Sequence, residues 1–229
     1  LAKQALAKAG EDQKIAKDVN TILIKVYQKQ GNQKAALQLL YSTLEKDPDS
    51  IELRYILGMA LLSNGPFMQL EKSAANLLLV CRQIPYDDAA YEFFGLAMAK
   101  RGRMRIAHSS LLGALRLNPK NIAVKKALAQ FPEIPGDRTP GLQPANILLE
   151  TYPSRSPSKL EQVLLDPNGR PVPDGIVVEW HENGRLKHFM DFDHGVPDGI
   201  ELSWDSEGRV LSRTDYRHGK PVSSTKNLP

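Results

Sequence analysis

Residues 174–197 read DGIVVEWHENGRLKHFMDFDHGVP, and residues 198–221 read DGIELSWDSEGRVLSRTDYRHGKP. The two 24-residue blocks adjoin without a gap and share ten identical positions, including a Trp, a Gly-Arg pair and a His-Gly pair. A repeat of fixed period is typical of arrays whose units bury their apolar faces against neighbouring units. The sequence therefore predicts a tandem repeat array in the C-terminal half of the chain.

Within each block, apolar and polar residues alternate, which is the period of a strand buried on one face. Asn183-Gly184 and similar pairs separate the alternating runs, and Asn-Gly between such runs is a strong hairpin signal. We therefore expect an antiparallel β-meander with an apolar, aromatic face that carries Trp180 and Trp204. The expected strands lie near residues 161–165, 176–181, 185–192, 200–204 and 209–216.

The same alternation assigns the side chains of the returning strands to faces. It places Leu186, Met190, Phe192, Val210 and Tyr216 on the apolar face, and Lys187, Asp191, Arg213 and Asp215 on a charged face. We expect the apolar, aromatic face to be exposed and to offer a contact surface.

The first 131 residues predict consecutive amphipathic helices, because their apolar residues recur at spacings of three and four. Pro48, Pro85 and Pro119 each close an apolar run, and a glycine lies midway through each unit. Gly supplies a turn and Pro ends a helix, so the unit is helix, Gly turn, helix, Pro stop. We also expect a separate helix over residues 1–14 and a trailing helix over residues 121–131. Ile122, Val124, Leu128 and Phe131 should point inward from that trailing helix.

These helical units resemble tetratricopeptide repeats over about residues 17–121. The resemblance is most specific in the third unit, where large and small residues follow the family pattern at Tyr91, Phe94, Gly95, Gly102, Ala107, Leu111, Ala114 and Pro119. It implies an all-α helix-turn-helix solenoid of about three repeats plus a capping helix. Gly95 and Ala107 are expected to face each other where the helices cross, since larger side chains would overpack the crossing.

In that family the first helices line a concave groove, which implies a binding surface for a protein partner. Its residues in this chain are Lys25, Lys29, Tyr55, Met59, Leu62, Leu96 and Lys100. An apolar centre flanked by Lys suits an amphipathic helix or an apolar extended segment with acidic flanks. Two alternatives stay open, namely that the chain's own linker fills the groove or that water does.

Between the halves, residues 132–160 contain six prolines and two glycines, a composition that favours an extended connector. We therefore expect an α+β protein with two repeat domains. Its parts are a helical repeat domain over 1–131, a Pro-rich linker over 132–160, a β-repeat domain over 161–222 and a tail over 223–229.

Residues 161–222 follow the pattern G-x-x-x-x-W-x-x-x-G-R and then Y/F-x-x-G. This pattern resembles the bacterial variant of the MORN repeat, known from antitoxin-type proteins. The resemblance implies β-hairpins that bind another macromolecule, and in some members a toxin. Trp180 and Trp204 are the residues proposed for this contact, although a fold alone does not define an activity.

The net charge of +4 conceals two halves of opposite sign. Residues 1–132 carry 19 Lys and Arg against 11 Asp and Glu, whereas residues 133–229 carry 11 against 15. Such opposed charges suggest either docking between the halves or two different partners. Lys100, Arg101, Arg103, Arg105 and Arg116 cluster near one end of the third unit. No aromatic residues are interleaved with them, so nucleic acid is not an expected partner, and a turn that meets the acidic half is the simpler interpretation.

Catalytic and cofactor motifs are absent from the sequence. It contains no GxSxG, GxxxxGK[ST], GxGxxG after a strand or HExxH motif, and we expect neither enzymatic activity nor a cofactor. His181, His188, His194 and His218 lack the spacing of metal ligands, and no metal site is expected. The single cysteine, Cys81, is expected in the core. No apolar run reaches about 18 residues, so no transmembrane helix is expected.

These features predict a non-enzymatic adaptor or accessory subunit of a larger assembly. It would hold a partner segment in the helical groove and a second surface through the β array. The alternative is an antitoxin or immunity-type inhibitor that neutralises a toxin. The sequence predicts neither the partner nor the compartment, and since it lacks an initiator Met, a removed leader is an open alternative.

Overall fold

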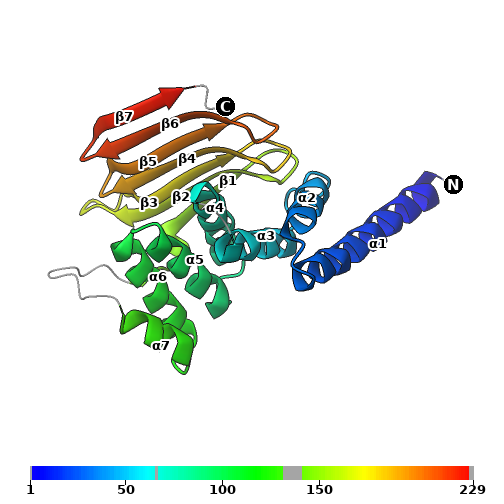
Figure 1. Ribbon diagram of the computed structural model, residues 1–229, viewed down its shortest axis with the longest axis horizontal. Helices are drawn as coiled ribbons and strands as arrows, with labels where there is room; N and C mark the ends of the chain where they lie inside the picture. Colours follow the sequence, from blue (N-terminus) through cyan, green and yellow to red (C-terminus); the bar gives the residue numbers. More distant parts are fainter. Residues whose placement is uncertain (1, 65–66, 131–140, 227–229) are drawn as a thin grey trace.

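The computed structural model describes residues 2–64, 67–130 and 141–226. In these ranges seven α-helices precede a seven-stranded antiparallel sheet, which confirms the predicted α+β class (Figure 1). The helices are α1 (Ala2–Lys29), α2 (Gln33–Leu44), α3 (Ile51–Asn64), α4 (Phe67–Gln83), α5 (Asp88–Lys100), α6 (Met104–Leu117) and α7 (Ile122–Leu128), and a short 3-10 helix, η1 (Pro144–Asn146), precedes the sheet.

The helices pack mainly against their neighbours in the chain, as helix-turn-helix pairs. Gly31 and Gly102 turn the chain between the helices of the first and third pairs, with φ of 73° and 75°, a conformation that favours glycine. A Cβ atom on Gly95 would lie 3.2 Å from the carbonyl oxygen of Ala107, which confirms the expected close crossing of α5 and α6. The helical half is thus a solenoid of helix-turn-helix pairs, as the repeat pattern predicts.

Two expectations for the ends of the helical half are wrong. First, α1 is one continuous helix, because residues 11–29 contain neither Gly nor Pro to interrupt it. Second, Ile122 is exposed and only Val124 is fully buried on α7, because this short helix presents one narrow side to α6. Phe131, also expected to point inward, lies outside the described residues.

The sheet has the strand order β1-β2-β3-β4-β5-β6-β7, as predicted for a meander. Its strands are β1 (Ile147–Thr151), β2 (Pro157–Leu165), β3 (Pro171–Trp180), β4 (Leu186–Asp193), β5 (Val196–Trp204), β6 (Val210–Arg217) and β7 (Lys220–Lys226). The sheet extends further than expected at both ends. β1 lies within the segment that was expected to be a linker. This segment forms a strand because its apolar Ile147 is buried and pairs with Gln162 of β2. At the other end, β7 reaches into the expected tail.

The predicted faces of β4 are reversed beyond its first residues. Glu179 pairs with His188 while Trp180 pairs with Leu186, so Lys187 is an extra residue in the ladder. Such a bulge shifts the alternation by one. Asp191 consequently shares a face with Trp180, whereas Met190 and Phe192 lie on the opposite face.

The second repeat contains the same irregularity, between Ser203 and Trp204. Arg213 pairs with Leu202 and Asp215 pairs with Ile200, so both charged residues lie on the face of the buried apolar residues instead of opposite to it. Recurrence of the bulge at the equivalent position shows that it belongs to the repeat unit.

The inner face of the sheet, defined by Ile176, Val178, Trp180, Phe189, Ile200, Leu202 and Trp204, packs against the helices. These residues belong to one apolar cluster with α4, α5 and α6, and Figure 1 shows the sheet lying over α4. Trp180 and Trp204 are each only 1% exposed, so the expected exposure of the aromatic face is wrong. The reason is that α4, α5 and α6 present a complementary apolar surface to the sheet. Cys81 is buried in the same cluster, as expected.

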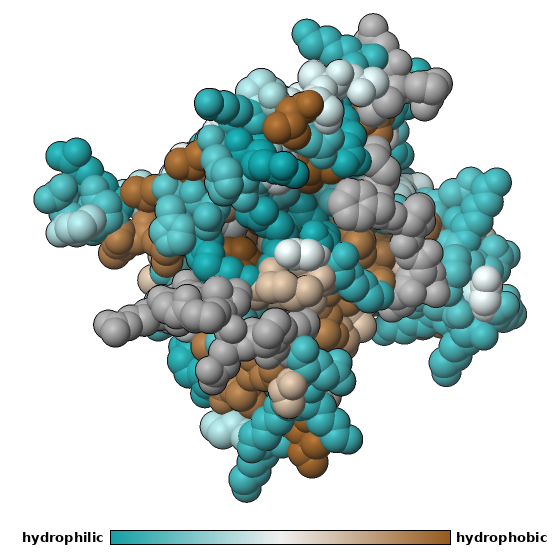
Figure 2. Space-filling model, turned by 60° about the vertical axis from the view of Figure 1, so that its left-hand side comes forward, coloured by the Kyte–Doolittle hydropathy of each residue, from teal (hydrophilic) through white to brown (hydrophobic). Residues whose placement is uncertain are grey.

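Hydrophilic side chains cover most of the side of the molecule shown in Figure 2, and hydrophobic ones form separate small groups. No described helix combines the length and hydropathy needed to cross a bilayer.

The backbone of Gly141 and Leu142 docks directly on α6, where the amide of Leu142 donates to the carbonyl of Ser109 at 2.8 Å. A Cβ atom on Gly113 would lie 2.7 Å from the carbonyl oxygen of Leu142. We expect Gly113→Ala to lower the free energy of unfolding by about 1–3 kcal/mol, because backbone must move to relieve the overlap. Urea unfolding measures this loss.

Gly95→Ala is the matched comparison for Gly113→Ala. Its Cβ would chiefly meet the side chain of Leu111, at 3.0 Å, which can move more easily than backbone. Gly95→Ala should therefore lower the free energy of unfolding by less than Gly113→Ala does. An equal or larger decrease would show that the segment docked at Gly113 contributes little to stability.

Candidate functional site

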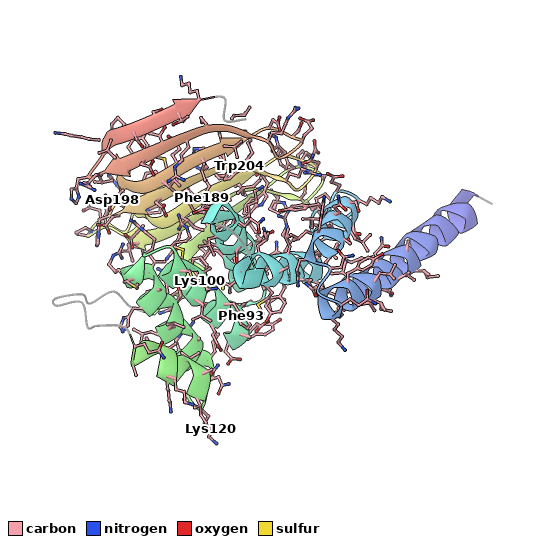
Figure 3. All side chains as sticks on the ribbon, in the orientation of Figure 1. Phe93, Lys100, Lys120, Phe189, Asp198 and Trp204 are labelled. Carbon is pink, nitrogen blue, oxygen red and sulfur yellow. The ribbon has the colours of Figure 1, made fainter. Side chains whose placement is uncertain are left out.

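Polar and aromatic side chains are concentrated in two regions of the described structure. One is the docking interface between the helices and the sheet. The other is the first-helix face, defined by Lys25, Lys29, Tyr55, Met59, Leu62, Phe93, Leu96 and Lys100 on α1, α3 and α5. Figure 3 shows Phe93 and Lys100 on the helical part, and Phe189 and Trp204 on the sheet above it.

Arg54 of α3 ties the solenoid to the first repeat of the sheet. Its guanidinium is fully buried and donates to the carbonyl oxygens of Pro48, at 2.8 Å, and Gly184, at 3.2 Å. A third acceptor is Oδ1 of Asn76 at 3.1 Å, and the guanidinium carbon lies 5.3 Å from the ring centroid of Trp180. Arg54 therefore fixes the turn between β3 and β4 against α3 and α4.

A buried ion triad joins the start of the α5–α6 turn to β4. The guanidinium of Arg101 donates to Glu71 at 3.0 Å and to both carboxylate oxygens of Asp191, at 3.0 and 2.7 Å. It also lies 4.6 Å from the ring centroid of Phe189. All three charged side chains are at most 2% exposed.

Burial dominates the electrostatics of this triad. It raises the pKa of Glu71, and the attraction of Arg101 only partly offsets this effect. Burial also lowers the pKa of Arg101, but Asp191 and Glu71 together outweigh it, so this pKa lies above its usual value. A buried charge that loses its partner costs free energy. Because separation of the sheet from the helices would break this triad, the triad couples the stability of the two halves.

Arg103 and Arg105 extend this ionic contact along the edge of the sheet. Arg105 donates to Asp174 at 2.8 Å and to Asp193 at 2.7 Å, and Arg103 lies 3.5 Å from Asp198. Burial alone would raise the pKa of Asp193, but Arg105 and His194 outweigh it and hold this pKa below its usual value. The basic cluster thus meets the acidic half of the chain, as the simpler interpretation of the sequence expected.

His194 and His218 occupy equivalent turns in the two repeats. Their φ angles are 50° and 48°, and their amides donate to Asp174 at 2.9 Å and to Asp198 at 3.0 Å. Ligand atoms of Asp174, Asp193 and His194 lie within 4.8 Å of one another. Because Arg105 already donates to both carboxylates, the geometry here is that of an ion-paired turn.

The first-helix face has an aromatic centre. Tyr55 of α3 and Phe93 of α5 make an edge-to-face contact with ring centroids 6.4 Å apart. Met59 and Leu96 are half-buried beside them, and Leu62 is buried. Phe93 was missed in the sequence, where its neighbour Phe94 matched the repeat pattern; its signal was an aromatic residue one position before a core residue.

The lysines of this face differ in their surroundings. Lys100 donates from Nζ to the carbonyl oxygen of Leu62 at 3.0 Å, which ties the end of α5 to α3. Lys25 makes a long contact with Glu52, at 3.9 Å, and Lys29 is exposed at the end of α1. The structure therefore brings Tyr55, Met59, Leu62, Leu96 and Lys100 together, while Lys25 and Lys29 lie on the neighbouring α1.

The α5 side of the first-helix face is acidic, which the sequence interpretation did not anticipate. Burial raises the pKa of Tyr55, and Asp87, Glu92 and Asp88 raise it further. Asn121 of the α7 cap donates to Asp88 and Glu92, at 3.1 and 2.9 Å, and holds these carboxylates in place. An aromatic centre thus lies between an acidic side and a lysine-bearing side.

The outer face of the sheet carries polar pairs beside Met190 and Phe192, which lie on the same face. Lys187 donates to Glu179 at 3.0 Å, and His188 lies 3.0 Å from Glu201. An open hollow of about 630 Å³ lies over this face and is lined by His181, His188 and Leu211 among others. This outer face is accessible, whereas the aromatic face is buried against the helices.

Comparisons with known proteins find similarity to solved structures over about half of the chain. No protein-family model and no curated protein matches the chain. Among solved structures, MamA of AMB-1 is 26% identical, with a TM-score of 0.45 over 49% of this chain and 60% of MamA. The first TPR of Spaghetti (RPAP3), bound to the HSP90 peptide SRMEEVD, is 18% identical, with a TM-score of 0.46 over 50% of this chain and 88% of that one. This chain thus spans less than two thirds of the length of MamA.

Proposed function

We propose that this chain is a non-enzymatic protein-interaction adaptor whose first-helix face holds an apolar segment of a protein partner. The observation that carries the proposal is the placement of the sheet. It packs against the solenoid through its inner face, while Phe93 lies on the helical part away from it (Figure 3). Tyr55 contacts Phe93 there, with ring centroids 6.4 Å apart. The sheet thus braces the solenoid.

The side chains of this face suggest what it would bind. An aromatic or aliphatic anchor would pack against Tyr55 and Phe93, where a half-buried surface already excludes part of the water. A basic residue of the partner would lie toward Asp88 and Glu92, and an acidic residue toward the α1 lysines. The partner segment would therefore carry opposite charges on the two sides of an apolar centre.

The outer face of the sheet would be the second contact surface of the chain. The two 24-residue repeats continue to support a MORN-like assignment, through the shared Trp, Gly-Arg and His-Gly positions. Toxin neutralisation through the aromatic face is not proposed, because the helices cover that face. Membership of a larger assembly is part of the proposal and follows from two separate contact surfaces on one chain.

A displayed library of random peptides, selected on the full chain, tests the first-helix face. The selected peptides should share an apolar anchor with a basic residue on one side and an acidic residue on the other. Tyr55→Ala should weaken their binding by about thirtyfold, equivalent to the ~2 kcal/mol typical of a central anchor. Isothermal titration calorimetry measures the loss.

Tyr86→Ala is the matched control, because Tyr86 is an exposed tyrosine that precedes α5 and lies outside the first-helix face. It should leave binding unchanged, while circular dichroism verifies that both variants stay helical. If Tyr55→Ala bound the selected peptides as tightly as the parent chain, the first-helix face would not be the binding site.

A further inference from the structure

The helix α1 carries an apolar stripe that faces away from the other described helices and the sheet. Ile15, Val19, Ile22 and Val26 are 54, 49, 61 and 39% exposed. Ile24, on the opposite side of the helix, is completely buried against α2. Figure 1 shows α1 extending away from the other helices and the sheet. We name these four residues the α1 stripe.

The spacing within the α1 stripe is four, three and four residues. This is the spacing of the a and d positions of a coiled coil, in which each helix buries a narrow seam against another helix. Four β-branched residues in this pattern exceed what a helix needs to pack on α2 alone. The stripe therefore has the form of a helix-pairing surface.

We propose that the α1 stripe pairs with the α1 stripe of a second copy of this chain, in the antiparallel direction. The two-fold axis would pass between positions 20 and 21. Val19 of each copy then packs against Ile22 of the other, and Ile15 against Val26. A two-fold interface uses the same patch on both subunits, so a self-complementary stripe satisfies it without any further surface.

Charge favours this direction of pairing. Asp18 and Lys25 both flank the α1 stripe on the same side, seven residues apart. In the antiparallel register, Asp18 of each copy faces Lys25 of the other, which gives two opposite-charge pairs per dimer. In a parallel pair, Asp18 would instead face the apolar Leu23. Lys25 can reach across, since its contact with Glu52 is long and its side chain is 58% exposed.

The other flank of the α1 stripe is complementary in size. Ala16 and Leu23 lie there, and Leu23 is 40% exposed. In the antiparallel register, Leu23 of each copy covers Ala16 of the other, so a large residue meets a small one on both sides of the axis. The opposite charges on one flank and the complementary side-chain sizes on the other therefore favour the same antiparallel register.

Sedimentation equilibrium of the full chain tests the pairing. We expect a mass that rises with concentration toward twice 25.5 kDa. Ile22→Glu should weaken the association by at least about a hundredfold, because it places two charges in the buried seam. Ile122→Glu is the matched control: Ile122 is 67% exposed on α7, far along the chain from the stripe, and its replacement should leave the dimer intact.

A charge swap tests the register. Asp18→Lys alone should weaken the dimer by about tenfold, and the double variant Asp18→Lys with Lys25→Asp should restore it. A mass of 25.5 kDa at every concentration would overturn the proposal. So would a dimer that survives Ile22→Glu, or a dimer that the double variant fails to restore. None of these outcomes depends on the first-helix face binding a partner.

Discussion

Replacement of Arg101 by methionine is expected to lower the free energy of unfolding by about 3–5 kcal/mol, the cost of breaking a buried ion pair from one side. The methionine fills similar space but leaves the carboxylates of Glu71 and Asp191 buried without their guanidinium. Asp191 retains the amide of Ile200, at 2.9 Å, and the more distant guanidinium of Arg103, at 3.9 Å, so part of its charge stays compensated. Urea unfolding of the full chain measures the loss.

Two further variants separate charge from packing. Arg101→Met combined with Glu71→Gln and Asp191→Asn should be more stable than Arg101→Met alone, because no buried charge then lacks a partner. Arg209→Met is the control for an exposed pair, since Arg209 contacts Asp205 at 2.7 Å on the surface, and its unfolding midpoint should not change. The triad would not couple the halves if Arg101→Met were as harmless as Arg209→Met.

Trp180→Ala is the second large effect, with an expected loss of about 3–5 kcal/mol. The side chain is 1% exposed at the contact between β3 and the solenoid, so its removal leaves a cavity between them. Arg54 also loses the ring that its guanidinium contacts at 5.3 Å. The measurement is again the free energy of unfolding in urea, with the helical circular dichroism as the signal.

Trp180→Phe is the matched variant. It keeps an aromatic ring in the cavity, and no acceptor among the described residues lies within hydrogen-bonding distance of the indole N–H that it removes. Trp180→Phe should therefore lower the free energy of unfolding by much less than Trp180→Ala does. If both substitutions had the same small effect, Trp180 would not contribute to the docking of the sheet.

The sequence predicts the architecture because each half repeats its own local signals. The Gly turns and Pro stops marked the helical units, and the Asn-Gly turns and alternating residues marked five of the seven strands. β1 was missed because six prolines surround it, and its strand character depends on pairing with β2. Asp191 was assigned to the wrong face because a bulge at Lys187 has no simple sequence pattern.

The candidate site was less predictable, since it depends on how the halves meet. Opposite charges on the two halves suggested docking, but an alternating strand does not reveal whether its apolar face is covered by solvent, by a partner or by another part of the chain. Trp180 and Trp204 illustrate this, because the same pattern fits an exposed and a buried face. Phe93 was missed because its contact with Tyr55 joins two repeats.

The proposed function and the expected effects of Arg101→Met and Trp180→Ala all require that the helices and the sheet dock into one folded unit. The chain has two tryptophans, and both lie at this interface, so their fluorescence reports on docking, while far-UV circular dichroism reports mainly on the helices. Equilibrium unfolding followed by both signals should give one transition with coincident midpoints. A fluorescence transition that is complete before helicity is lost would show that the sheet separates from helices that remain folded, which contradicts docking into one unit.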